Sequence, residues 1–256
     1  MTTGDPWDPV QYNRFADQRE QPFVDLVGLL EPVERPAVVD LGCGDGRLTA
    51  GLHRRLGASG TLGVDRSASM IGAASAHATD TVAFELGDIG EFEAPGRYDV
   101  VVANASLQWV PDHPSVLARW ARALRPGGQL AVQVPANADH PAHRLAAELA
   151  AEWLADPPGD PVAENVLAPE AYSVLLDQLG FDRQHVRLQV YLHHLASTAD
   201  VVEWVKGTTL TRFTEPLGAR WPAFVDHYRE RLLGLLGDRS PYPYAFKRIL
   251  WWARKP

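Results

Sequence analysis

The chain has 256 residues, of which 46% are hydrophobic and 22% are charged, and its formal net charge is −8. These values are typical of a globular chain with one α/β domain of up to about 250 residues, and they exclude extensive disorder. The acidic balance also excludes a general nucleic-acid-binding protein, which would carry a basic face.

The cysteine content and the distribution of apolar residues indicate where in the cell the protein is located. Cys43 is the single cysteine, so no internal disulfide can form. No apolar run is long enough to cross a bilayer or to act as a signal peptide. We therefore expect a cytoplasmic protein that has neither a nucleic-acid nor a membrane partner. The sequence does not indicate an oligomeric state.

The first predicted element is a helix that begins near Pro9 and ends before Pro32. Apolar residues recur there at helical spacing, namely Tyr12, Phe15, Ala16, Phe23, Leu26, Val27 and Leu30. This helix either packs on the sheet or covers a ligand cleft with Tyr12 and Arg19. We assign residues 7–31 as an N-terminal helical lid.

A glycine-rich turn follows the first predicted strand, at 37–41, and precedes a helix. Gly42 and Gly44 can adopt backbone conformations that other residues avoid, so a ligand can approach the main chain. A dinucleotide fingerprint would place a glycine where this chain has Arg47. Asp40 adds a fixed negative charge beside the turn, which suits an ammonium group better than a phosphate.

The next two predicted strands, at 60–65 and 81–86, also lead to acidic residues. Asp65 can accept hydrogen bonds from both hydroxyls of a ribose. Asp88 can accept one from an exocyclic amine of adenine, although a solvent-exposed loop acid explains it equally well. Met70, in the helix between these strands, can cover the base or belong to the core. Acids at the ends of three successive strands predict a site for an adenosine-containing ligand.

The fourth predicted strand, at 98–103, is nearly all apolar, as expected for a strand covered on both faces. The segment Asn104-Ala-Ser-Leu-Gln-Trp109 follows it at the carboxyl edge of the sheet, where open α/β folds bind ligands. Asn104, Gln108 and Trp109 can therefore face a reacting group and its acceptor. Alternatively, Trp109 packs under the next helix.

The rest of the pattern completes an α/β fold. Residues 125–128 read as a tight turn, and further strands are predicted at 129–134, 186–192 and 246–253. Strands alternating with helices predict a doubly wound, Rossmann-like sheet of seven strands. We assign a single domain over 1–256, a cofactor-binding core at 36–135, and a helical cap at 197–240, inserted between the last two strands.

No catalytic triad and no metal site are indicated by the sequence. It contains no Ser-x-Gly elbow and no helix with paired metal ligands. His193 and His194 are adjacent on a predicted strand, where successive side chains point to opposite faces. Cys43 fits a small residue in a tight turn better than a nucleophile. We therefore expect no bound metal.

The Asp-x-Gly-x-Gly pattern at 40–44 resembles the first motif of class I S-adenosylmethionine-dependent methyltransferases. Longer strings resemble the trans-aconitate 2-methyltransferase family within that class. The matching residues are Trp7, Pro9, Tyr12, Phe15, Ala16, Arg19, Pro22, the segment 103–109, Pro111, Asp112, His113, the segment 130–133, Pro135, Asn137, Pro141, His143, Phe246, Arg248, Ala253 and Arg254. The resemblance covers most of the first 145 residues and the end of the chain.

This resemblance implies that S-adenosyl-L-methionine is the cofactor and that a methyl group is transferred to a carboxylate of trans-aconitate or a related small polycarboxylic acid. The expected cofactor-binding residues are Asp40, Leu41, Gly42, Cys43, Gly44, Asp65, Arg66, Met70, Asp88, Ile89, Asn104 and Ala105. Gln108, Trp109 and Tyr12 are the expected catalytic residues, because in-line transfer needs aligned reactants shielded from water. A carboxylate is already ionised at neutral pH and needs no general base.

An acidic acceptor needs cationic partners. Arg19, Arg212 and Arg248 are the candidates, since a guanidinium binds a carboxylate through two parallel hydrogen bonds, and Trp204 joins them. The cap departs from the family pattern: Leu-Arg-Pro is expected where this chain has Leu210-Thr-Arg212. A different acceptor, such as a natural-product acid, a phenol or a carbon atom, therefore remains an alternative. A non-catalytic cofactor-binding protein is a further one.

Overall fold

The computed structural model describes residues 16–256, which form two compact units. Unit 1 contains residues 136–164 and 190–247, together with the described residues before Glu20. Unit 2 contains residues 20–135, 165–189 and 248–256. The assignment of a single domain over 1–256 stays a prediction.

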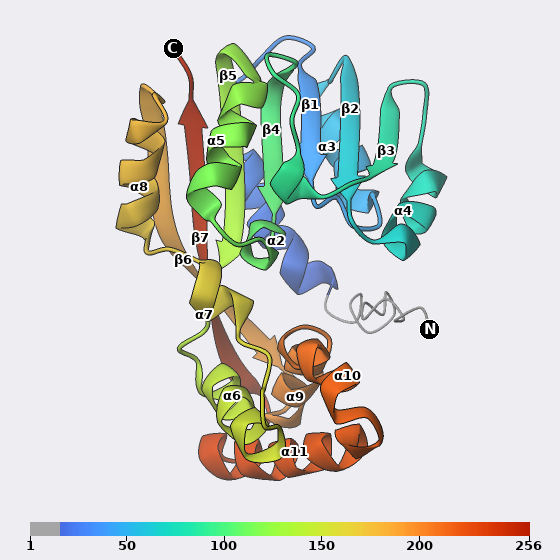
Figure 1. The fold of residues 1–256 in the computed structure, drawn as a ribbon, viewed down its shortest axis with the longest axis vertical. Coiled ribbons are helices and arrows are strands. Elements are labelled where there is room, and N and C mark those ends of the chain that lie inside the picture. Colours follow the sequence, from blue (N-terminus) through green and yellow to red (C-terminus); the bar gives the residue numbers. More distant parts are fainter. Residues whose placement is uncertain (1–15) are drawn as a thin grey trace. The chain divides into compact units, whose positions relative to one another are not determined.

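The chain forms one seven-stranded sheet with the strand order β3-β2-β1-β4-β5-β7-β6 (Figure 1). Its strands are β1 Ala37–Leu41, β2 Gly60–Asp65, β3 Val82–Leu86, β4 Tyr98–Asn104, β5 Leu124–Pro135, β6 Arg183–Leu195 and β7 Tyr242–Arg254. Strands β1 to β5 pair in parallel, and β7 pairs antiparallel with β5. The predicted doubly wound α/β fold is therefore confirmed.

The centre of unit 2 is the apolar pair β1 and β4. Val38, Val39, Val101 and Val102 are fully buried, as expected for strands covered on both faces. The helices of this unit include α3 (Arg47–Leu56), α4 (Ala68–Ala74), α5 (His113–Ala123) and α8 (Pro169–Gln178). In Figure 1, α5 lies in front of the strands and α3 behind them. Short 3-10 turns also occur, at Ser75–His77, Ile89–Glu91 and Leu107–Trp109.

The predicted bounds are correct for β1 and β2 and too narrow for the last three strands, β5, β6 and β7. Residues 125–128, predicted as a turn, lie inside β5 instead. The register of β5 against β4 shifts there, between Tyr98 and Val100, so the glycine-rich segment forms an irregularity within the strand. Proline and glycine predicted a break at this place but could not distinguish a turn from a bulge.

Helix α2 (Ala16–Val27) is the described part of the predicted N-terminal helix. Phe23, Leu26 and Val27 are buried, so its second half packs in the core. Tyr12 and the side chain of Arg19 lie outside the described residues. The assignment of 7–31 as a lid therefore stays a prediction.

Helices separate β6 from β7 in the chain, as the predicted cap requires. They are α9 (Ala199–Lys206), η4 (Thr209–Phe213), α10 (Thr214–Leu217), η5 (Gly218–Arg220) and α11 (Trp221–Leu236). Within unit 1 they share a core with α6 (Pro141–Trp153), in which Leu149, Phe213 and Phe224 are fully buried. The Tyr228 hydroxyl donates a 2.9 Å hydrogen bond to the Ala142 carbonyl. A short helix, α7 (Pro161–Asn165), was not predicted.

Within residues 16–256, no helix has both the length and the apolar character needed to cross a membrane. The expectation of a cytoplasmic location stays a prediction.

Candidate functional site

Three acidic residues lie at the carboxyl ends of adjacent strands in unit 2. Asp40 is the fourth residue of β1, Asp65 ends β2, and Asp88 follows β3 by two residues. Because β3, β2 and β1 are neighbours in the sheet, these acids share one edge. The structure thus brings together the three acids that the sequence singled out.

The bend after β1 requires glycine for two different reasons. Gly42 and Gly44 have φ of +86° and +56°, a region that other residues rarely adopt. A Cβ atom at Gly42 would lie 2.1 Å from the Ser106 Cβ, whereas one at Gly44 would meet nothing within 4 Å. The bend is therefore packed on one side and open at its second glycine, so its backbone is accessible to a ligand.

Asp40 is a buried carboxylate, with only 3% of its surface exposed. Burial raises the pKa of Asp40, a hydrogen bond from Thr49 opposes the rise, and the nearby Asp65 adds to it, so that the pKa is about 6. That bond, from Thr49 Oγ1 to Asp40 Oδ2, measures 2.6 Å. A buried carboxylate with one neutral donor is well suited to a cationic partner, which would compensate the cost of its burial.

Asp65 fixes the same bend from the neighbouring strand. Its Oδ2 accepts a 2.9 Å hydrogen bond from the Gly44 backbone N–H, and its Oδ1 accepts one from the Ser67 N–H. Each carboxylate oxygen has a further lone pair available, so the group can also accept from a ligand hydroxyl. Asp65 thereby links the glycine bend to the start of α4, where Met70 is buried and Arg66 is exposed.

Asp88 and Ile89 form a short capped turn. Asp88 is exposed, and its Oδ1 accepts a 2.8 Å hydrogen bond from the Gly90 N–H. Ile89 is buried, and its carbonyl accepts a 2.9 Å bond from the Trp120 indole N–H. Helix α5 thus holds this turn at the edge of the sheet.

The segment 104–109 begins with a backbone conformation that is rare for its residue type. Ala105 has φ of +54°, and its N–H donates to the Gln133 carbonyl at 2.9 Å. Ser106 Oγ donates a 2.6 Å bond to the Leu41 carbonyl, which joins this loop to the end of β1. Two neighbouring strand ends are therefore connected directly beside the glycine bend.

Asn104 and Gln108 each present a buried oxygen to this region. Neither Asn104 Oδ1 nor Gln108 Oε1 has a hydrogen-bond partner within the described part of the chain. The amide group of Gln108 is oriented by its bond to the Ala105 carbonyl, at 2.7 Å. Buried acceptors without partners are unfavourable and point to a bound donor. Trp109 is half-buried, and its backbone N–H donates to the Ser106 carbonyl.

The remaining predicted residues have varied environments. Leu41 and Cys43 are buried, and burial raises the pKa of the Cys43 thiol, which disfavours a thiolate nucleophile. Arg248 is buried in unit 2 and donates to Gln133 Oε1 at 3.1 Å. Trp204 is buried in the aromatic core of unit 1, stacked 5.3 Å from the His193 ring. The binding and catalytic roles assigned to these positions stay predictions.

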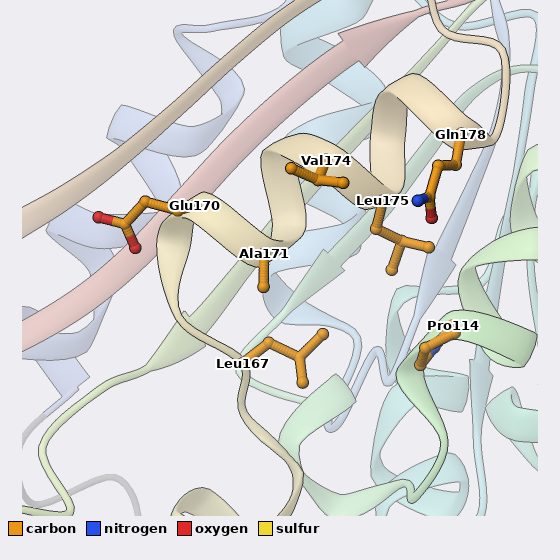
Figure 2. A pocket seen from close by; sticks show the side chains of 7 residues that line it. All are labelled: Pro114, Leu167, Glu170, Ala171, Val174, Leu175 and Gln178. Atoms are coloured by element: carbon orange, nitrogen blue, oxygen red, sulfur yellow. The ribbon is translucent and has the colours of Figure 1, made fainter.

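Among residues 16–256, no three His, Cys, Asp or Glu side chains are grouped so that they could hold a metal ion. A surface pocket of about 430 Å³ lies along α8 and the start of α5 (Figure 2). Its lining is largely apolar and consists of Pro114, Leu167, Glu170, Ala171, Val174, Leu175 and Gln178. It contains none of the predicted site residues, and we assign it no function.

Sequence reasoning missed three supporting residues in unit 2. Thr49 donates a hydrogen bond to Asp40, and Ser106 donates one to the Leu41 carbonyl at the end of β1. His113 Nε2 lies 3.0 Å from the Leu107 carbonyl, and its Nδ1 lies 2.7 Å from the Tyr172 hydroxyl. Ser106 and His113 lie in segments that match the family pattern, but nothing in that pattern indicated their contacts, and Thr49 had no signal beyond its place on the helix after the bend.

Comparison with known proteins gives the family. A family profile described as "Methyltransferase domain" matches residues 34–169. The trans-aconitate 2-methyltransferase of Deinococcus radiodurans is 42% identical over 98% of both chains, and that of Streptomyces avermitilis is 39% identical over 97% of both.

Solved structures share the fold at much lower identity. The YcgJ protein of Bacillus subtilis has a TM-score of 0.63 at 15% identity, covering 92% of this chain and 98% of its own. A phosphoethanolamine N-methyltransferase of Haemonchus contortus, solved with S-adenosylhomocysteine, has a TM-score of 0.59 at 17% identity, covering 93% of this chain and 52% of its own. The likeness to full-length relatives identifies the chain as a member of the trans-aconitate 2-methyltransferase family.

Proposed function

We propose that the protein transfers a methyl group from S-adenosylmethionine to a carboxylate of trans-aconitate or a closely related small polycarboxylic acid. The observation that carries the proposal is the buried Asp40 beside the open glycine bend, in a chain whose full-length relatives are named for this reaction. The products are a methyl ester and S-adenosylhomocysteine.

The residues at the edge of the sheet fit this cofactor. Asp40 supplies a buried negative charge for the ammonium of the methionine part, and the backbone at Gly44 leaves open space for it. Asp65 and Asp88 suit the ribose hydroxyls and the adenine amine, with Met70 and Ile89 as apolar neighbours. Asn104 Oδ1, which has no hydrogen-bond partner within residues 16–256, can accept from a cofactor donor. Leu41, Gly42, Cys43, Arg66 and Ala105 complete the proposed set.

The cofactor supplies an electrophilic methyl group on a sulfonium. The protein therefore has to hold the acceptor in line, exclude water and balance the acceptor's charge. We assign alignment to Gln108 and Trp109, with Tyr12 as their predicted partner, because Gln108 presents a buried acceptor oxygen in the loop after β4. No base is assigned, since the attacking carboxylate is already ionised at neutral pH.

Charge balance for the acceptor is assigned to Arg19, Arg212 and Arg248, with Trp204 as an apolar neighbour. Of these, Arg248 has a buried guanidinium whose Nη1 is oriented by Gln133. A cation held in this way can bind a carboxylate in a fixed geometry.

A transfer assay tests the proposal. The protein is incubated with S-adenosylmethionine carrying a labelled methyl group and with trans-aconitate, and the product is treated with mild base. Release of labelled methanol by base is the expected result, because an ester is base-labile and a methylated amine or carbon is not. Binding of the cofactor, followed by calorimetry, without transfer to any small polycarboxylic acid would overturn the assignment of the acceptor.

A further inference from the structure

Arg212 is a largely buried cation in unit 1. It lies in η4, its side chain is 10% exposed, and its guanidinium is stacked 4.5 Å above the Phe213 ring. Burial lowers the pKa of Arg212, and the neighbouring Asp160 and Glu164 carboxylates oppose that change. The Asp160 carboxylate is a neighbouring anion, with its Oδ2 3.6 Å from Arg212 Nη1. One edge of the guanidinium is therefore occupied by an internal counter-ion.

The opposite edge of the same guanidinium has no hydrogen-bond partner among residues 16–256. Both Nε and Nη2 of Arg212 are buried, and neither has a hydrogen-bond partner in the described part of the chain. These two nitrogens carry parallel N–H groups on one side of the guanidinium plane, in the arrangement that binds both oxygens of a carboxylate. Burying two charged donors without acceptors is costly, so this edge, which no residue of 16–256 fills, points to a bound anion.

The surrounding side chains hold this geometry. Asp160 Oδ1 accepts a 3.0 Å hydrogen bond from the Val162 N–H, so the carboxylate that orients Arg212 is itself fixed at the start of α7. His143 is buried beside it, with Nδ1 3.0 Å from Thr209 Oγ1 and 4.0 Å from Asp160 Oδ2.

His143 contributes without adding charge. Burial, aided by the neighbouring His140 and Arg212, lowers the pKa of His143 to about 4, against the opposing effect of Asp160 and Asp139. The ring is thus neutral at pH 7, and its buried Nε2 also lacks a partner among the described residues. Arg212 remains the cation of this group.

We propose that the Nε–Nη2 edge of Arg212, oriented by Asp160, is a binding site in unit 1 for a carboxylate of the small polycarboxylic acid on which the protein acts. The inference rests on the proposed function for the identity of that acid. It adds Asp160 as a positioning residue, and it places Thr209 and His143 next to the bound group.

The test compares two arginines of unit 1. Arg212→Lys keeps the charge that Asp160 requires but lacks the parallel N–H pair. Arg231→Lys is the control, because Arg231 is 48% exposed and lies 4.0 Å from Glu152. Binding of trans-aconitate and of its saturated analogue tricarballylate is measured by calorimetry, together with acceptor KM, cofactor KM and kcat.

We expect Arg212→Lys to weaken tricarboxylate binding and to raise the acceptor KM by about 10–100-fold, with the cofactor KM unchanged. Arg231→Lys should behave as the unaltered protein does. Asp160→Asn should raise the acceptor KM by a smaller factor, because the guanidinium is then less well oriented. If Arg212→Lys is folded, by its thermal midpoint, and has an unaltered acceptor KM, the inference is overturned while the proposed function stands. If the unaltered protein methylates no polycarboxylic acid, the proposed function fails, and binding of tricarballylate to the two arginine variants still decides whether this site exists.

Discussion

Thr49 donates a 2.6 Å hydrogen bond to the buried carboxylate of Asp40. The two residues lie on β1 and α3, on either side of the glycine bend, so the packing of the helix against its own preceding strand creates the contact. This neutral donor lowers the free-energy cost of burying the ionised carboxylate, but it does not neutralise the charge. The predicted ligand cation would supply the remaining stabilisation.

Asp40→Asn should raise the stability of the protein and weaken its binding of S-adenosylmethionine. Since a rise in pKa from 3.8 to about 6 corresponds to about 3 kcal/mol, removing the buried charge should raise the free energy of unfolding at pH 7 by up to about that amount. The same change should weaken S-adenosylmethionine binding by at least about tenfold, because the ammonium loses its counter-ion. Urea unfolding and calorimetry measure the two effects. Tight cofactor binding by Asp40→Asn would contradict the assignment of this residue.

Stability and cofactor affinity should respond to pH in opposite directions. The raised pKa of Asp40 means that, between about 4 and 6, the folded protein binds a proton that the unfolded chain has released. The contribution of Asp40 to stability is therefore fully present below this range and is lost as the pH rises through about 6. Cofactor affinity should increase over the same interval, because the ionised form binds the ammonium.

Thr49→Val tests the cause of this pH dependence. Removing the donor to Asp40 should move the midpoint of the affinity curve to higher pH, because the ionised carboxylate loses a hydrogen bond. Calorimetric titrations at a series of pH values from 5 to 8 provide the measurement. A midpoint identical to that of the unaltered protein would show that another group controls the titration.

Gly42→Ala and Gly57→Ala form a matched pair. Both glycines have a left-handed backbone, with φ of +86° and +57°, but only Gly42 would place a Cβ atom against Ser106, at 2.1 Å. Gly57→Ala should cost about 1 kcal/mol from the backbone alone. Gly42→Ala should cost more than about 3 kcal/mol, because it adds the steric clash. If thermal unfolding shows equal losses of stability for the two variants, the loop after β4 must move away to relieve the clash with Ser106.

Tyr172→Phe should weaken the attachment of the loop after β4. The Leu107 carbonyl can only accept, so neutral His113 donates through Nε2 and accepts from the Tyr172 hydroxyl through Nδ1. Burial lowers the pKa of His113, which favours this neutral ring. Losing the hydroxyl leaves Nδ1 without its donor and should cost about 1–2 kcal/mol in unfolding free energy. An unaffected unfolding free energy would count against this arrangement.

The acids of the site were predictable because their positions follow from topology. Asp40, Asp65 and Asp88 follow parallel strands, whose carboxyl ends necessarily meet at one edge. Thr49 and Ser106 were not predicted, since their contacts depend on side-chain direction and on packing between segments distant in the chain. The glycine pattern showed that the bend is open to a ligand, but not that Ser106 occupies its other side.

The environment of Arg212 shows the same limit. Its charge made it a candidate, but no feature of the sequence connects it with Asp160, which lies in a proline-rich segment between Gly159 and Pro161. The partner of a buried arginine is set by the tertiary fold, and no periodicity encodes it. The number of strands, by contrast, follows from local apolar patterns and was predicted correctly.

The sheet order has a consequence for synthesis of the protein. Strand β7 lies between β5 and β6, although β6 is made earlier. Until residues 242–254 have left the ribosome, β5 has an open edge and β6 has no strand to join. A nascent chain that stalls before Tyr242 therefore exposes two unpaired strands at once, and it should depend on chaperones until translation resumes.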